Sequence, residues 1–183
     1  MKKVLLLPGW MRGIDLYHAG DLEIRIGKLD EYAASADCLI GISLSTLVIL
    51  RDMHKIKGKV ILVNPLLPSQ SLVRWIIALW KLITNEGLFL ERQKFSRNPF
   101  KYVATSIDAM QLVHKDFSET LEKISENKLV VIRGKGDHFF CDAKSADFLR
   151  AQNIQLIEVD GGHSWSEAAE RAVGNYMKDC GKA

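Results

Sequence analysis

Cysteine is scarce in this sequence, with only three in 183 residues. Cys38, Cys141 and Cys180 are far apart and form no C-x-x-C motif. A disulfide framework and a cysteine-based zinc site both need paired or closely spaced cysteines, so this spacing argues against each of them. The pattern suits a protein of a reducing compartment, and we expect a cytoplasmic location.

Net charge and long apolar runs are lacking as well. The formal charge is +3, and the lysines and arginines are dispersed along the chain, which argues against a nucleic-acid partner. The apolar run at 4–7 ends at Pro8-Gly9, too early for the hydrophobic region of a signal peptide. No window approaches the length of a membrane span, so we expect none.

Short apolar runs rich in Val, Ile and Leu recur along the chain, and several show little polar alternation. Such runs are typical of strands covered on both faces, and helical patterns separate most of them. This order predicts one α/β domain over 1–183, with an open, mostly parallel sheet of about six strands and helices on both faces. The expected strands are 4–7, 22–26, 38–42, 60–63, 129–133 and 154–159, and the expected helices are 29–35, 46–55, 143–152 and 166–178.

The stretch at about 66–126 interrupts this alternation and contains no convincing strand pattern. In a helix over 72–83, Arg74, Ala78 and Lys81 would share one narrow face. The remaining surface is apolar, and it is wider than one core-facing stripe requires. We interpret the stretch as a helical lid, with Trp75 and Trp80 lining an apolar substrate cavity. Extra core helices are the alternative, and further helices are expected over 99–114 and 116–124.

The segment Gly41-Ile42-Ser43-Leu44-Ser45 joins an expected strand to an expected helix, with Ser43 at the apex. A sharp turn of this kind exposes the serine oxygen and directs the following backbone N–H groups at the reacting centre. Ser45 stands where a second glycine is usual in such turns. Taken alone, the segment fits a nucleophile turn and a Gly/Ser turn without chemistry equally well.

Two aspartates compete as the acidic partner of a serine nucleophile. Asp137 lies in the loop after the strand 129–133, at the edge where open α/β sheets place their sites. Asp142 directly precedes the helix 143–152, and a role as its N-cap explains it without chemistry. We therefore favour Asp137.

His163 is the candidate base. It follows the last strand and the pair Gly161-Gly162, which permits a tight turn. Ser164 and Glu167 have capping-box spacing, so we expect the final helix to be anchored directly after the histidine. The remaining histidines lie in an early loop, on helices or beside the candidate acid: His18, His54, His114 and His138.

Ser43, Asp137 and His163 therefore all follow strands of one sheet, in the chain order serine, acid, histidine. In such an arrangement the histidine takes the serine proton and the aspartate fixes the imidazole tautomer. A tetrahedral intermediate also needs an oxyanion hole, whose donors contribute about 3–4 kcal/mol each. We assign these donors to the backbone N–H groups of Leu44 and Trp10.

These motifs together resemble those of the α/β-hydrolase superfamily over nearly the whole chain, and most closely its lidded esterases and carboxylesterases. The resemblance rests on 7–10, 41–45, 134–137 and 162–163. It implies the α/β-hydrolase fold and no cofactor or metal. Three departures stand out: the chain starts at the family's third strand, without the first hairpin; Ser45 replaces a glycine; and Pro8 replaces a common histidine.

We expect a serine hydrolase that cleaves small-molecule carboxylic esters through an acyl-enzyme on Ser43. The apolar lid favours an apolar acyl or aromatic group on the substrate. A catalytically silent module of the same fold, binding a ligand or partner, is the alternative. An acidic carrier protein is a further candidate partner, since basic and aromatic residues alternate in one stretch, which otherwise is a solvated face: Arg92, Lys94, Phe95, Arg97, Phe100 and Lys101.

Overall fold

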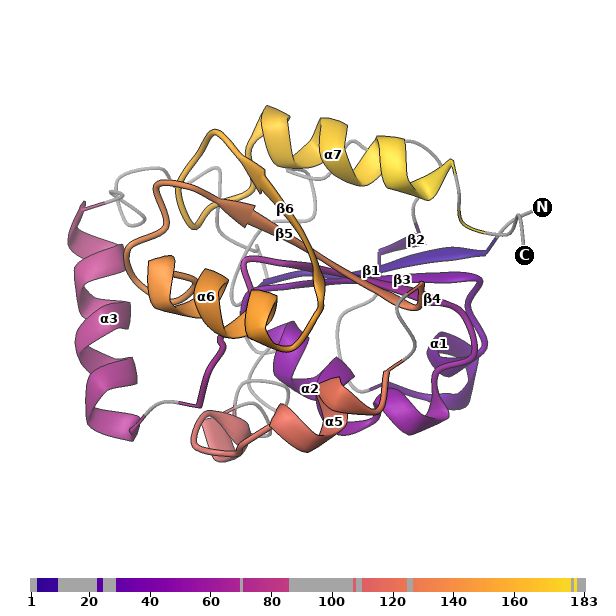
Figure 1. Cartoon of the computed structure of the whole chain (residues 1–183), viewed down its shortest axis with the longest axis horizontal. Coiled ribbons are helices and arrows are strands. Elements are labelled where there is room, and N and C mark those ends of the chain that lie inside the picture. Colours follow the sequence, from indigo (N-terminus) through magenta and orange to yellow (C-terminus); the bar gives the residue numbers. More distant parts are fainter. Residues whose placement is uncertain are drawn as a thin grey trace.

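A six-stranded parallel sheet forms the centre of the molecule (Figure 1). The computed structural model describes residues 3–9, 23–24, 29–69, 71–85, 107, 110–124, 127–178 and 180. The strand order is β2-β1-β3-β4-β5-β6, and each neighbouring pair is parallel. The strands are β1 (Val4–Leu7), β2 (Glu23–Ile24), β3 (Cys38–Ile42), β4 (Lys59–Val63), β5 (Leu129–Gly134) and β6 (Gln155–Val159). The predicted α/β class is confirmed.

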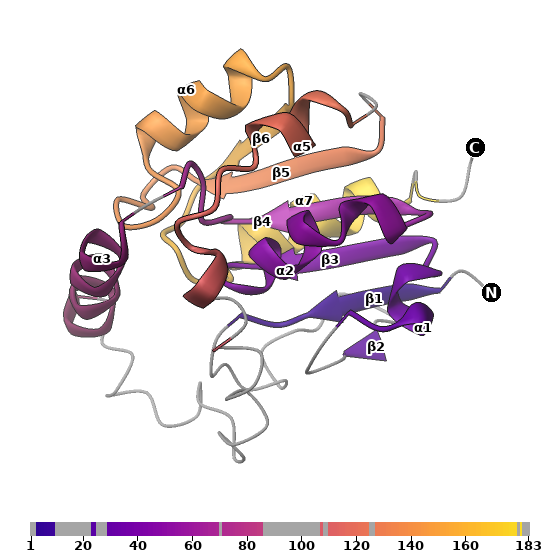
Figure 2. The same ribbon diagram turned by 90° about the horizontal axis from the view of Figure 1, so that it is seen from below.

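Helices cover both faces of this sheet (Figures 1 and 2). One face carries α1 (Glu31–Ala34), α2 (Ser45–Arg51), α5 (Ser118–Glu122) and α6 (Ala143–Ala151), and the other carries α7 (Glu167–Met177). The 3₁₀ segment η2 (Met53–Lys55) follows α2, within the helix predicted over 46–55. Helix α3 (Leu72–Asn85) stands at one end of the molecule, away from these two layers.

The strands are buried because successive side chains enter the two helix layers alternately. In β1, Leu5 and Leu7 pack under the layer of α2 and α6, whereas Val4 and Leu6 pack under α7. Cys38 of β3 is buried in the second layer, where its sulfur lies 3.0 Å from that of Cys180. The two sulfurs form no disulfide.

Local hydrogen bonds determine where the later helices begin. Asp142 caps α6 by accepting from the Ser145 N–H at 3.0 Å, as the sequence predicted. Helix α7 is capped by Ser166, which accepts from the Ala169 N–H at 3.2 Å. The prediction that the capping box at Ser164 starts this helix was wrong, because the cap lies two residues later.

Within 66–126, the described residues are helical or irregular and contain no strand. Helix α3 buries Trp75 and Ala78, and exposes Ile76, Ile77 and Trp80. Its wide apolar face therefore points away from the sheet. None of the described helices is both long and apolar enough to cross a membrane.

Candidate active site

Ser43 occupies a sharp turn between β3 and α2. Its φ is +53°, a left-handed backbone conformation that is strained for a residue with a side chain. The Ser43 N–H donates to the Val63 carbonyl at 2.9 Å, and the Thr46 N–H donates to the Ser43 carbonyl at 3.1 Å. A Cβ on Gly41 would lie 2.4 Å from Cδ1 of Ile49, so this glycine lets β3 and α2 pass closely. The turn therefore holds the serine oxygen at the carboxyl edge of the sheet.

Ser45, which replaces the usual glycine, fits this turn as a buried bridge. It lies in α2 with ordinary helical geometry, and only 3% of its surface is exposed. Its hydroxyl accepts from the Ile42 N–H at 2.8 Å and lies 2.8 Å from the carbonyl oxygen of Leu7. The side chain thus joins the ends of β1 and β3 directly beneath the elbow.

The three predicted residues meet in one hydrogen-bonded chain. Ser43 Oγ lies 2.8 Å from His163 Nε2, and His163 Nδ1 lies 2.6 Å from Asp137 Oδ2. The serine is half-buried, whereas the histidine and the aspartate are buried. Of these three hydrogen-bonded side chains, only Ser43 is therefore open to a substrate.

Asp137 is ionised although it is buried. Burial opposes its charge, but the interaction with His163 and the backbone N–H groups of Phe139 and Phe140 outweigh burial and lower the pKa of the Asp137 carboxyl. Those two groups donate to Oδ1 at 3.0 and 3.1 Å, and the Cys141 N–H donates to Oδ2 at 3.2 Å. A carboxylate held in this way accepts from His163 Nδ1–H, which leaves Nε2 to accept the Ser43 proton.

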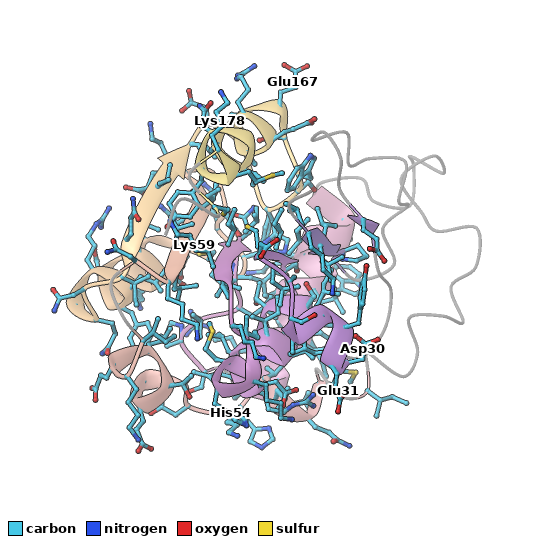
Figure 3. The ribbon with its side chains drawn as sticks, turned by 90° about the vertical axis from the view of Figure 1, so that its right-hand side faces the viewer. Asp30, Glu31, His54, Lys59, Glu167 and Lys178 are labelled. Carbon is cyan, nitrogen blue, oxygen red and sulfur yellow. The ribbon has the colours of Figure 1, made fainter. Side chains whose placement is uncertain are left out.

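The competing residues have other environments. Asp142 caps α6, and its Oδ2 lies 3.7 Å from Arg74. His114 and His138 are exposed. His54 is exposed in η2, which connects the end of α2 to the amino end of β4 and so lies on the side opposite Ser43. Figure 3 shows its side chain at the surface, apart from Lys59 at the start of β4. His18 lies outside the described residues.

Cys141 neighbours Asp137, but burial and the Asp137 charge raise the pKa of its thiol, so it stays protonated. Within the described part of the chain, no group of three or more His, Cys, Asp or Glu side chains is placed to hold a metal ion. At this edge the triad brings together a hydroxyl, an imidazole and a carboxylate.

Of the two predicted oxyanion donors, the structure describes Leu44 but not Trp10. Leu44 follows Ser43 directly and lies at the amino end of α2, where its N–H belongs to the first helical turn. Trp10 lies outside the described residues. Gly9, which precedes it in the sequence, lies against the elbow, since a Cβ there would be 3.6 Å from Cβ of Ser43.

Trp75 and Trp80 lie on opposite sides of α3. Trp75 is buried, and its indole N–H has no hydrogen-bond partner among the described residues. Trp80 is 68% exposed. That both line one substrate cavity stays a prediction. A mainly apolar pocket of about 380 Å³ does lie beside α3, and neither tryptophan lines it; its lining is Leu72, Ile107, Met110, Gln111, Val113 and His114. The basic residues between 92 and 101 lie outside the described residues.

Asn64 is a site residue that the sequence patterns did not single out. It follows β4 at the same edge as the triad, is 1% exposed, and has a φ of +46°. A polar residue directly after an apolar strand and before Pro65 reads as an ordinary turn signal. Its position at the end of a central strand was the signal that could have identified it.

No family model matches the sequence, and no curated protein matches it either. Solved structures do resemble it. An esterase from Thermogutta terrifontis, solved with malate bound, matches with a TM-score of 0.65 at 14% identity, over 98% of this chain and 89% of its own. The enol-lactonase from Burkholderia xenovorans LB400 matches with a TM-score of 0.65 at 13% identity, over 98% and 91%. A monoacylglycerol lipase from Paleococcus ferrophilus matches with a TM-score of 0.56 at 15% identity, over 96% and 93%. At sequence identities this low, the structural likeness shows a common fold and nothing more.

Proposed function

We propose that this chain, which has the α/β-hydrolase fold, is a serine hydrolase that cleaves carboxylic esters through an acyl-enzyme on Ser43. The observation that carries the proposal is the continuous relay from Ser43 Oγ to His163 Nε2 at 2.8 Å and from His163 Nδ1 to Asp137 Oδ2 at 2.6 Å. The structures that share the fold include an esterase, a lactonase and a lipase, which supports a hydrolytic activity.

The relay is suited to a two-step reaction. Ser43 Oγ attacks the ester carbonyl carbon while its proton moves to His163 Nε2. The tetrahedral intermediate collapses, and the alkoxide leaves with that proton. Water then attacks the acyl-enzyme, giving its proton to His163, and the acid product departs as the proton returns to Ser43 Oγ. Asp137 stays ionised throughout and stabilises the protonated imidazole.

The negative charge on the carbonyl oxygen needs donors beside Ser43. The Leu44 N–H at the start of α2 is one, and the Trp10 N–H remains our choice for the other. The contact of Gly9 with the elbow supports this choice, because Trp10 is the next residue along the chain. Donors of this kind lower the barrier by about 3–4 kcal/mol each.

We propose a small-molecule ester with an apolar acyl or aromatic group as the substrate. The apolar surface of α3 and the pocket beside it support this choice. We propose that 66–126 forms a lid within a single domain. Trp75 and Trp80 stay candidates for substrate contact, and an acidic carrier at 92–101 stays a lesser candidate. The three cysteines form no disulfide with one another, which suits a reducing location such as the cytoplasm.

A catalytically silent module is the competing function. It would be favoured by a Ser43–His163 separation too long for a hydrogen bond. The 2.8 Å separation, together with the ionised and fully bonded Asp137, favours the enzyme instead.

Labelling with a fluorophosphonate probe tests the proposal. We expect the wild-type protein to be labelled and Ser43→Ala to be unlabelled. Ser71→Ala, which removes an exposed serine before α3, is the matched control and should label normally. A folded wild-type protein that resists labelling, or a labelled Ser43→Ala variant, would refute the proposal. A panel of p-nitrophenyl esters of increasing acyl length then defines the substrate class.

A further inference from the structure

We infer that Asn64 is a positioning residue that holds the loops of the three triad residues in register. Its expected effect on turnover rests on the proposed function. Its expected effect on the His163 ring does not, because that effect depends only on the contacts described below.

The backbone at the end of β4 already joins two of the three loops. β4 lies between β3 and β5 in the sheet. The carbonyl of Val63 accepts from the Ser43 N–H at 2.9 Å, and the Asn64 N–H donates to the Ile132 carbonyl at 2.9 Å. The nucleophile turn and the strand that leads to Asp137 are thus fixed to adjacent residues.

The Asn64 side chain adds the third loop. Its Oδ1 accepts from the Gly134 N–H at 2.8 Å, where the loop to Asp137 begins. Its Nδ2 donates to the carbonyls of His163 at 2.8 Å and Gly162 at 3.2 Å. The partners lie 70, 99 and 98 residues away in the sequence. One amide thereby connects the acid loop to the histidine itself.

Only an amide satisfies this arrangement. One of its ends faces a backbone donor and the other faces two backbone acceptors, so the oxygen and nitrogen of Asn64 have a single consistent orientation. The residue is 1% exposed, so in the folded chain the amide itself, and not bulk water, satisfies these three backbone groups. Its left-handed φ of +46° is also one that asparagine tolerates better than most residues.

The loops that Asn64 joins are packed backbone against backbone. A Cβ on Gly134 would lie 2.3 Å from the Gly162 carbonyl oxygen, and the Gly136 N–H donates to the Gly161 carbonyl at 2.8 Å. Asn64 is the buried side chain that bonds to both sides of this junction. Without it, the backbone of His163 loses its fixed distance from the acid loop and from Ser43.

Asn64→Gly isolates the role of the amide, because glycine adopts the left-handed conformation freely and keeps the backbone bonds. Misplacement by about 1 Å can cost about 100-fold in rate, so we expect kcat to fall by about 10- to 100-fold with little change in KM. Asn153→Gly is the matched control. Asn153 has a φ of +54° but is exposed and precedes β6 at the opposite edge, so its loss should leave kcat unchanged.

Asn64→Asp tests whether position 64 lies close enough to His163 to alter its titration. The variant keeps the side-chain shape but turns a carboxylate oxygen toward two carbonyls and adds a negative charge near His163. That charge stabilises the protonated imidazole, so the acidic limb of the kcat/KM profile should move to higher pH. An unchanged profile would count against a position of residue 64 beside His163, and so against the positioning role.

NMR of the His163 ring separates failure of this inference from failure of the proposed function. The ring signals are assigned with His163→Ala, and the Nδ1 proton reports the bond to Asp137. If the wild type hydrolyses no ester, but Asn64→Gly shifts this proton and Asn153→Gly does not, the proposed function fails and the positioning role stands. If Asn64→Gly keeps the wild-type ring signals, kcat and pH profile, the positioning role is refuted.

Discussion

The carboxyl edge of the sheet and the outer face of α3 are built in opposite ways. At the edge, buried polar groups are bonded on every side: the two oxygens of Asp137 lie within hydrogen-bond distance of four nitrogens. On α3, apolar side chains face outward, and the buried indole N–H of Trp75 finds no hydrogen-bond partner in the part of the chain that the structure describes. Tyr32 aside, the large hydrophobic side chains exposed in the described part of the chain all belong to 72–80 or to 107 and 110.

This difference shows that hydrogen bonds fix the geometry of the carboxyl edge more strictly than packing fixes the position of α3. Directional bonds between groups far apart in the sequence fix the edge to one geometry. Helix α3 contacts the rest of the molecule through a narrow buried face around Trp75 and Ala78, so fewer contacts fix its position than fix the edge. We expect substitutions at the edge to alter chemistry sharply, and substitutions on the outer face of α3 to alter folding very little.

The largest effect is expected for His163→Ala. The variant removes the base that accepts the Ser43 proton, and loss of such a residue costs about 10⁴-fold or more in kcat. Hydrolysis of p-nitrophenyl acetate by the purified variant measures it. His138→Ala is the control, because His138 is exposed and directly follows Asp137; this variant should retain full activity. Turnover that survives in His163→Ala would place the reaction elsewhere in the molecule.

Asp137→Asn should rank next. The amide no longer fixes the proton on His163 Nδ1, and the equivalent change in a serine protease lowers kcat by about 10⁴-fold. Asp142→Asn is the control, since that side chain caps α6 instead. If Asp142→Asn were the inactive variant and Asp137→Asn the active one, the assignment of the acid would be reversed.

Asp137 also links stability to pH. Because its pKa is lower in the folded chain, ionised Asp137 stabilises the fold above the pKa of about 3.9 that an unfolded aspartate has. This contribution is lost as the pH falls from that value through the lower folded pKa. Melting temperatures measured from pH 7 to pH 2 should therefore fall less steeply at the acid end in Asp137→Asn than in the wild type. Parallel curves for the two proteins would contradict the lowered pKa.

The sequence predicted the sheet and the edge well because both follow from short-range patterns. Strands β1 and β3 were predicted with the bounds that the structure has, since each is an apolar run buried on both faces. The parallel order then places residues that follow strands at one edge, so Ser43, Asp137 and His163 could be grouped without a structure. The predicted α/β-hydrolase fold is likewise confirmed by the structures that it resembles.

What the sequence could not predict depends on partners distant along the chain. The role of Asn64 requires Gly134 and His163 to meet it, and nothing local to 64 signals that. The periodicity of α3 places Arg74, Ala78 and Lys81 on one narrow face. It does not predict that Trp75 and Ala78 are buried while Arg74 and Lys81 stay exposed. Ser164 and Ser166 both suit a helix cap, and the structure selects the second.

Ser45→Ala should have an intermediate effect at the edge. It leaves the Ile42 N–H without its partner at 2.8 Å and removes the bridge to Leu7. An unsatisfied buried group costs about 1–3 kcal/mol, so the free energy of unfolding should fall by that amount. Urea denaturation measures it, with Ser118→Ala on the partly exposed start of α5 as the control. A Ser45→Ala protein as stable as the wild type would mean that the bridge contributes nothing.

The smallest effect is expected on the outer face of α3, and it tests the comparison from its other side. Ile76 is 50% exposed, so Ile76→Ala opens no cavity and should change the free energy of unfolding by less than about 0.5 kcal/mol. Leu149→Ala is the counterpart in the body, because Leu149 of α6 is fully buried and its truncation should cost about 2–5 kcal/mol. Urea denaturation of both variants under the same conditions gives the two losses in free energy of unfolding. Equal losses would mean that the outer face of α3 is covered in solution, and the contrast between the two regions would then fail at α3.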